Sequence, residues 1–431
     1  MQPVRTLSIF LLVLCHMQAI VPAAAPASLV LFAACHFDRF RLYRKLPQTV
    51  TFAALFLGYC LFLLLIHGML RDYSLIEILR TSGRLMYMVG VFLLAAHLRT
   101  DAHVEKPLFY STTITAAAIS VLAIISCYVT PLSIAGMPLS TSRSLTGFFE
   151  NHNTMAGAVG VALLMTALAW LHGKQHRMPV LFNRRVATLA AVLALAFALC
   201  LSRAYSIGML AACGGIAWMI PRKKLRRQAY VGGIAAGAAL AVFVVINRSA
   251  EIDTRNVYDR TYLYQRAVRE VIKSPLVGIG PSAFQELHGR QRTIVPNLLV
   301  VRQSGVTAPE DKKSTHDIHG AGGAHVHNTY LQLLCDYGLI GAGLLTVLSF
   351  HFWRGARQTH RTLLAEDDPP LELDYADWNA KLVLGSFVFL AVAGLFVNWC
   401  FSSPPYTLVG YVSLGRFTAW RYDLSVYRPV A

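Results

Sequence analysis

The chain has 431 residues, of which 55% are hydrophobic and only 14% are charged, yet its formal net charge at pH 7 is +17. Because a soluble domain usually carries about a quarter charged residues, this composition excludes a disordered protein and an ordinary soluble enzyme. It also argues against a nucleic-acid binder, which needs a basic patch on a water-soluble fold. The composition favours a membrane protein that keeps its positive charge in cytoplasmic loops.

Apolar runs long enough to cross a bilayer as helices, about 20 residues with some shorter, recur along the whole chain. They predict an all-α polytopic membrane protein with about 12 transmembrane helices and one large outside loop containing short helices. We divide the chain into nine helices over 1–246, the loop over 247–328, and three helices with a cytoplasmic tail over 329–431. The twelve segments are 6–20, 24–37, 48–69, 75–98, 107–130, 154–172, 186–202, 206–220, 229–246, 329–352, 381–401 and 405–420.

The distribution of Lys and Arg predicts the orientation of these segments. With the N-terminus in the cytoplasm, the inside segments hold 22 of the 39 basic residues, whereas the short outside loops hold only Arg71, Arg143 and Arg203. This is the asymmetry of the positive-inside rule, and it places both termini in the cytoplasm. The 247–328 loop then lies outside, and its eleven basic residues do not count because long translocated loops escape the rule. Arg5, the apolar run and the alanines at 23–25 also fit a cleavable signal peptide, which leaves the rest of the topology unchanged.

Arg203 follows Ser202 between two apolar segments, on the side where positive charge is disfavoured. It can reach lipid headgroups by extending its side chain to the membrane surface. A fixed anionic partner explains its position better.

The stretch 259–273 has the apolar spacing of a helix that Pro275 ends, with Lys273 in its last turn. Arg260, Tyr264 and Arg266 on this helix are candidates to approach one anion. The alternative is an amphipathic helix that lies on the membrane surface and faces lipid phosphates.

Histidines cluster before the segment at 329–352, at 316, 319, 325 and 327, and a Gly/Ala stretch separates the two pairs. Histidine can act as a base near neutral pH, and His327 is the candidate. The four histidines with Glu310 and Asp317 are also possible zinc ligands, but their spacing matches no helix-borne metal motif. A polar loop without chemistry is the third interpretation.

Further candidates for substrate binding or support lie near these places. Asn151 and Asn153 precede the sixth helix, where an Asn can cap the helix or hydrogen-bond a sugar. Arg80 and Arg84 lie one turn apart inside an apolar segment, so we expect each to be paired or to face a polar cavity, with Glu77 a candidate partner. The candidate list is completed by Arg143, His325 and Asn328.

Arginines and a base at the outer membrane edge, without a phosphate-binding loop, predict a reaction on a lipid-linked diphosphate. Arg203, Arg260 and Arg266 would bind the diphosphate and stabilise its charge as it leaves. A hydroxyl activated by His327 would attack the sugar carbon bonded to it.

These residues resemble the O-antigen ligase and O-antigen polymerase superfamily of bacterial envelopes. The resembling stretches are GFFENHN at 147–153, Ser202 and Arg203, Arg260 with Tyr264, SPLVGIG at 274–280, HNTYLQLL at 327–334 and YGLIG at 337–341. Their order and the long loop before the last three helices make the set specific. The motif matches Arg260 four residues before an aromatic residue, whereas Arg266 and the other histidines have no counterpart.

The resemblance implies a GT-C-like, inverting and metal-independent glycosyltransferase without cofactors, in the bacterial inner membrane with its active site facing the periplasm. The donor would be an undecaprenyl-diphosphate-linked glycan, and in a ligase the acceptor would be lipid A–core oligosaccharide. His327 would activate the acceptor, and Arg203 and Arg260 would bind the diphosphate. The alternatives are an O-antigen polymerase, a protein O-oligosaccharyltransferase, and a flippase of lipid-linked glycan that needs no base.

Overall fold

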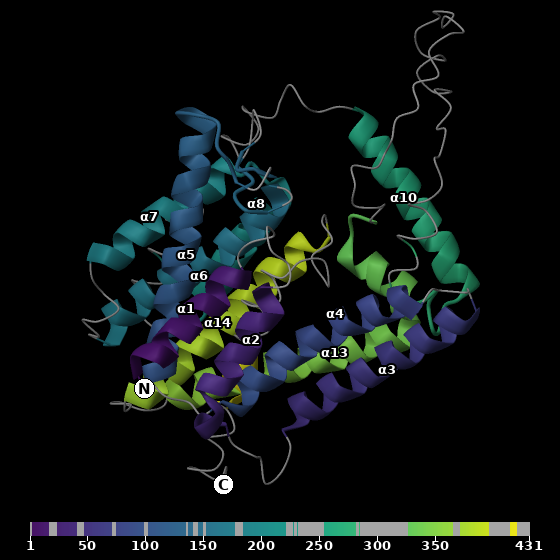
Figure 1. The fold of residues 1–431 in the computed structure, drawn as a ribbon, viewed down its shortest axis with the longest axis horizontal. Helices are drawn as coiled ribbons and strands as arrows, with labels where there is room; N and C mark the ends of the chain where they lie inside the picture. Colours follow the sequence, from purple (N-terminus) through teal and green to yellow (C-terminus); the bar gives the residue numbers. More distant parts are fainter. Residues whose placement is uncertain are drawn as a thin grey trace, which may run out of the picture.

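The structure is a computed structural model (Figure 1). It describes residues 2–16, 24–40, 47–70, 75–98, 102–134, 137–140, 145–149, 152–176, 184–220, 227, 231, 254–281, 284, 326–364, 371–395 and 414–419. The elements in chain order are α1 (Gln2–His16), α2 (Ala24–Cys35), the 3-10 helix η1 (Phe37–Arg39), α3 (Gln48–Leu70), α4 (Leu75–His97), α5 (Ala102–Tyr128), β1 (Ser133–Ile134), β2 (Met137–Pro138), α6 (His152–His176), α7 (Arg184–Leu199), α8 (Arg203–Trp218), α10 (Thr254–Lys273), α13 (Thr329–Leu364) and α14 (Leu371–Ala393).

Each predicted segment that the structure describes contains helix, although the ends differ in places. Residues 414–419 are helical within the predicted segment 405–420, whereas nearly all of 229–246 lies outside the described residues. The all-α prediction is therefore confirmed for the described residues, with one exception: the two-residue strands β1 and β2 pair antiparallel between α5 and α6.

Several predicted boundaries were wrong, and they share a physical cause. The helix α13 continues past residue 352 to Leu364, α14 begins at Leu371 instead of 381, and α10 begins at Thr254 instead of 259. The prediction followed apolar runs, whereas helical hydrogen bonding continues through polar flanks such as the one at Arg354 and Arg357. The 20-residue α10 is also longer than the short helices expected in the 247–328 loop.

Four helices in the described part of the chain are long and apolar enough to cross a membrane: Gln48–Leu70, Val104–Tyr128, His152–Trp170 and Thr329–Arg361. Large apolar side chains on their outer faces are exposed, including Leu55 and Phe62 of α3 and Phe350 of α13. Such surfaces would be unfavourable in water, whereas they suit contact with lipid tails. The chain is therefore a multi-pass helical membrane protein.

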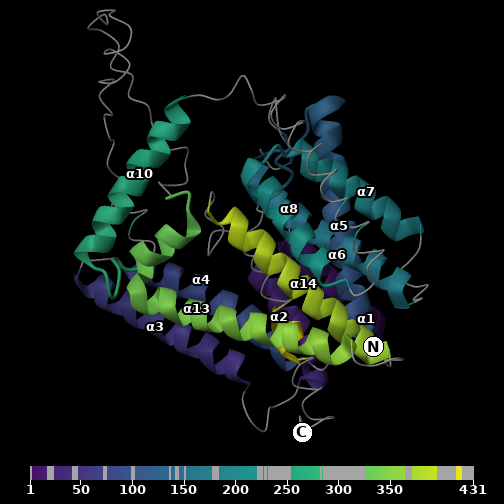
Figure 2. The same cartoon turned by 180° about the vertical axis from the view of Figure 1, so that it is seen from behind.

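The helices form a bundle, and a layer made of α3, α4 and α13 extends from it (Figure 2). In the bundle, α5, α6 and α7 pack together, and α14 packs on α6 and α8. On the other side, α13 runs beside α3, and α3 beside α4 (Figure 2). The helix α10 packs on α13 at the far end of this layer (Figures 1 and 2).

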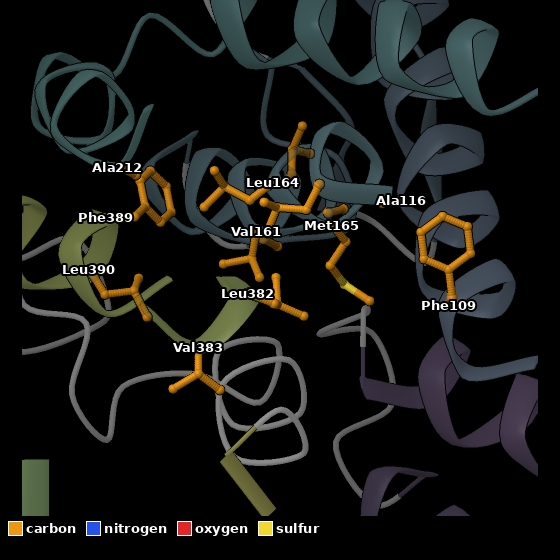
Figure 3. Close-up of a cluster of buried hydrophobic side chains, with 14 of the residues drawn as sticks. Phe109, Ala116, Val161, Leu164, Met165, Ala212, Leu382, Val383, Phe389 and Leu390 are labelled. Atoms are coloured by element: carbon orange, nitrogen blue, oxygen red, sulfur yellow. The ribbon is translucent and has the colours of Figure 1, made fainter. Parts of the chain in front are cut away.

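Small residues let α14 approach its neighbours closely in the bundle core, part of which is drawn in Figure 3. A Cβ added at Gly208 of α8 would lie 2.5 Å from the backbone oxygen of Phe389, and one at Gly160 of α6 would lie 2.5 Å from the Phe389 ring. Glycine at helix contacts of this kind is typical of membrane bundles, where packing replaces the hydrophobic effect. Phe389 thus fills the space that the two glycines leave.

A buried ion pair joins the described C-terminal helix to the rest of the bundle. Arg416 donates to the Glu105 carboxylate from Nε (2.7 Å) and from a terminal nitrogen (2.5 Å), and the two side chains are 1% and 2% exposed. Its other terminal nitrogen donates to the backbone oxygen of Leu98 (2.6 Å). Arg416 therefore fixes residues 414–419 against the end of α4 and the start of α5.

Candidate functional site

Arg203 is the first residue of α8 and is exposed, at the end of a tight turn from α7. Leu201 in this turn has φ 54°, and Ser202 is 3% exposed. The Ser202 hydroxyl donates to Asn153 Oδ1 of α6 at 2.6 Å. The structure thus brings two predicted site residues, Arg203 and Asn153, to neighbouring helix starts.

His327 lies two residues before the first residue of α13, and its side chain is exposed. It has φ 56°, a left-handed conformation that costs a non-glycine residue energy and therefore needs support from its surroundings. Tyr264 of α10 supplies part of that support, because its hydroxyl donates to the backbone oxygen of His327 at 3.3 Å. Tyr264 therefore contacts the candidate base through its backbone, in addition to any role towards an anion.

Asn328 caps α13 and ties it to α14. Its Oδ1 accepts from the backbone N–H of Leu331 (2.9 Å), and its Nδ2 donates to the backbone oxygen of Leu395 (3.0 Å). The next residue, Thr329, donates its N–H to the backbone oxygen of Gly394 at 2.8 Å. Such capping satisfies the first N–H groups of a helix, so Asn328 has a structural task here.

Three helix starts converge where α14 ends. The helices α8 and α14 run antiparallel, since Gly208 meets Phe389 and Ala393 whereas Ile216 meets Gly385. The start of α8 thus lies at the end of α14 that also holds the start of α13, and Asn153 adds the start of α6 (Figure 2). Helix N-termini carry partial positive charge and the C-terminal end of α14 carries partial negative charge, so the full positive charge at this place comes from Arg203.

Arg260 and Arg266 lie on α10, which packs against the same end of α13. Arg260 is one turn before Tyr264 and its backbone is helical, whereas its side chain lies outside the described residues. Arg266 is partly buried. The buried residues Leu263 and Ala267 fix α10, and Cys335 Sγ of α13 donates to the backbone oxygen of Ala267 at 3.2 Å.

The SPLVGIG motif at 274–280 forms backbone hydrogen bonds to both sides of a break in α13, and we call this segment the clasp. Gly338 has φ 63° and ψ −169°, which interrupts the helix and frees backbone groups on both sides. Four backbone hydrogen bonds of 2.7–3.1 Å join the motif to the break: Ile279 to Cys335, Gly280 to Asp336, Leu339 to Pro275 and Ile340 to Leu276, donors first. The motif therefore has a structural role that the sequence did not indicate. The glycines of YGLIG, Gly338 and Gly341, were the sequence feature that could have suggested a break in this helix.

Gly278→Ala is expected to destabilise the protein by about 1–3 kcal/mol or more, because it strains the backbone and adds a clash. Gly278 has φ 71°, and a Cβ there would lie 2.6 Å from both the Cys335 oxygen and the Gly338 nitrogen. Unfolding in mixed micelles with increasing SDS measures the effect. Gly343→Ala on α13 is the control, since its Cβ would have nothing within 4 Å, and equal stability of the two variants would contradict the clasp.

The remaining predicted site residues are not placed. Asn151, Arg143 and His325 lie outside the described residues, and so do the side chains of Arg80 and Arg84, which occupy α4. The possible zinc ligands at 310, 316, 317 and 319 also lie outside them. Among the residues that are described, no group of three or more His, Cys, Asp or Glu side chains could hold a metal ion.

Comparison with known proteins connects these motifs to a family. A sequence model described as O-antigen ligase matches residues 188–346. The chain is also similar to the exopolysaccharide production protein ExoQ of Rhizobium meliloti (strain 1021), with 28% identity over 160 residues. That alignment covers 36% of this chain and 32% of ExoQ, so the chain spans about a third of the length of this curated relative. The resemblance to the O-antigen ligase family is thereby confirmed over residues 188–346, the part of the chain that holds Arg203, Tyr264 and His327.

Proposed function

We propose that this protein is an O-antigen ligase, which transfers a glycan from undecaprenyl diphosphate to lipid A–core oligosaccharide. The observation that carries the proposal is the convergence of Arg203 and His327 on the end of α14, where the starts of α6, α8 and α13 meet. An anion-favouring surface beside a histidine supports transfer from a diphosphate-linked donor. The O-antigen ligase match over residues 188–346 supports the same class of reaction.

In the proposed mechanism, His327 takes the proton of an acceptor hydroxyl, whose oxygen attacks the anomeric carbon of the donor glycan. The bond from that carbon to the diphosphate breaks, and the configuration of the carbon inverts. Arg203 and Arg260, with Arg266 nearby, stabilise the charge on the departing diphosphate, aided by the helix starts. The donor supplies the energy, and the reaction proceeds without a metal ion or cofactor.

The proposed topology has twelve spans, with both termini in the cytoplasm of a bacterium and the site on the periplasmic side of the inner membrane. Arg5, Arg39 and Arg354 then lie inside, whereas α10 and the starts of α8 and α13 lie outside. The positive-inside distribution of Lys and Arg supports this orientation. Within it, residues 247–328, which include α10, lie on the periplasmic side.

The second candidate is a polymerase that uses another lipid-linked glycan as acceptor. The similarity to a protein named for exopolysaccharide production favours it, because making a polysaccharide requires repeated glycan addition. Both candidates share the proposed donor chemistry and differ only in the acceptor.

The test is reconstitution of the purified protein in liposomes with an undecaprenyl-diphosphate-linked glycan. We expect glycan to appear on added lipid A–core, with or without a chelator. Elongation of the donor alone would establish the polymerase, and transfer to an acceptor peptide a protein O-oligosaccharyltransferase. Movement of the donor across the bilayer without transfer would establish a flippase. Loss of activity with chelator that zinc restores would overturn the metal-free mechanism.

A further inference from the structure

Two buried polar side chains form a chain of hydrogen bonds that leads to the residue before His327. Gln332 and Asp336, one turn apart on α13, are 7% and 6% exposed. Gln332 Nε2 donates to Asp336 Oδ2 (2.9 Å), and Gln332 Oε1 accepts from the backbone N–H of Val326 (3.3 Å). Val326 is fully buried in a cluster with apolar residues of α10 and the clasp.

The direction of this chain follows from the chemistry of its members. A carboxylate offers only acceptors, whereas an amide offers an oxygen acceptor and an NH₂ donor. Because Asp336 accepts from the NH₂ of Gln332, the amide oxygen of Gln332 faces Val326. If the amide turned over, two donors would meet at Val326 and a buried N–H would lose its partner, which is unfavourable.

The Val326 N–H is one of the points that fix the strained backbone of His327. A left-handed conformation is unfavourable for a non-glycine residue and persists only when its surroundings determine it. Here Gln332 holds the preceding residue, and Tyr264 holds the His327 oxygen. Thr329 is held by Gly394 on the other side. The conformation that presents the His327 side chain therefore depends on contacts from both directions.

We propose that Gln332 and Asp336 are positioning residues for His327: Asp336 orients the Gln332 amide, and the amide fixes the Val326–His327 backbone. This inference rests on the proposed function only in so far as His327 is the base. Neither side chain touches substrate in this role. The two side chains together hold the imidazole of His327 where it can reach the acceptor hydroxyl.

The test uses substitutions that keep or destroy the hydrogen-bond pattern while keeping size. Gln332→Met removes both hydrogen bonds, and we expect kcat to fall roughly 10- to 100-fold with an unchanged KM for donor, because misplacing a catalytic group by about 1 Å can cost 100-fold. Asp336→Asn retains an acceptor for the amide, so kcat should stay near the unsubstituted value. The double variant Gln332→Glu with Asp336→Asn should also keep kcat near the unsubstituted value, since the introduced carboxylate accepts from both the Val326 N–H and the introduced amide.

Hydrogen exchange of the peptide that contains Val326 gives a readout independent of activity. We expect faster exchange in Gln332→Met and unchanged exchange in Asp336→Asn and in the double variant. Unchanged kcat and exchange in Gln332→Met would overturn the proposal, as would equal losses in all three variants. If His327→Ala proved fully active while the exchange pattern held, the base assignment would fail and the positioning contacts would stand.

Discussion

His327→Ala is expected to reduce glycan transfer roughly 10²- to 10⁴-fold while leaving donor binding intact. A positioned general base contributes this much to proton transfer in the transition state, and the substitution leaves the arginines and helix starts unchanged. The hydroxyl of Tyr264 donates to the backbone oxygen of His327, so this hydrogen bond survives truncation of the side chain. The measurement is transfer to lipid A–core in liposomes, with donor binding measured separately.

The matched control is His351→Ala. His351 is a half-buried histidine further along α13, stacked on Phe52 at 4.8 Å between ring centroids. Its variant should keep full activity. Arg203→Ala is the contrasting variant, because it should weaken donor binding as well as transfer. Full transfer activity in His327→Ala would exclude His327 as the general base. If donor binding were lost in His327→Ala but kept in Arg203→Ala, the roles assigned to the two residues would be reversed.

The parts of the fold that were predictable are those with a local cause. Pro275 ends α10 just after Lys273, and the polar residues before Thr329 mark the start of α13, as their sequences indicate. The break at Gly338 was not predictable, because α13 also contains Gly341 and Gly343 and all three lie in apolar sequence. Which glycine takes positive φ depends on the 274–280 loop, whose place on α13 is a tertiary contact.

In the candidate site, too, the residue types were predictable from the sequence whereas the tertiary contacts were not. The chemical types of Arg203, Tyr264 and His327 could be recognised in sequence, but their contacts join segments far apart along the chain. Asn153 was expected to cap α6 or bind sugar, and in the structure its carbonyl accepts from Ser202, 49 positions away. Gln332 belongs to the HNTYLQLL stretch and Asp336 follows one turn later, but neither the motif nor the spacing indicates that the Gln332 amide bonds to Val326, which is a tertiary contact.

Arg416→Leu is expected to destabilise the protein by about 3–5 kcal/mol, because it leaves Glu105 as a buried charge without its partner. The two side chains are nearly inaccessible, and Arg416 also donates to the Leu98 backbone, which would lose that donor. The two residues are 311 positions apart in the sequence, so no local sequence pattern predicts their pairing. Glu105→Leu should cost a similar amount, since it leaves the guanidinium buried and uncompensated.

The double variant Glu105→Leu with Arg416→Leu decides whether the charges or the packing provide this stability. Replacing a whole buried pair by apolar residues is often neutral or stabilising, so we expect it to recover most of the loss in SDS-induced unfolding. The Arg5–Asp38 pair is the control: the Asp38 side chain is 63% exposed, so Asp38→Ala should leave the stability nearly unchanged. A single Arg416 variant no less stable than this control would show that the buried pair does not hold the C-terminal helix.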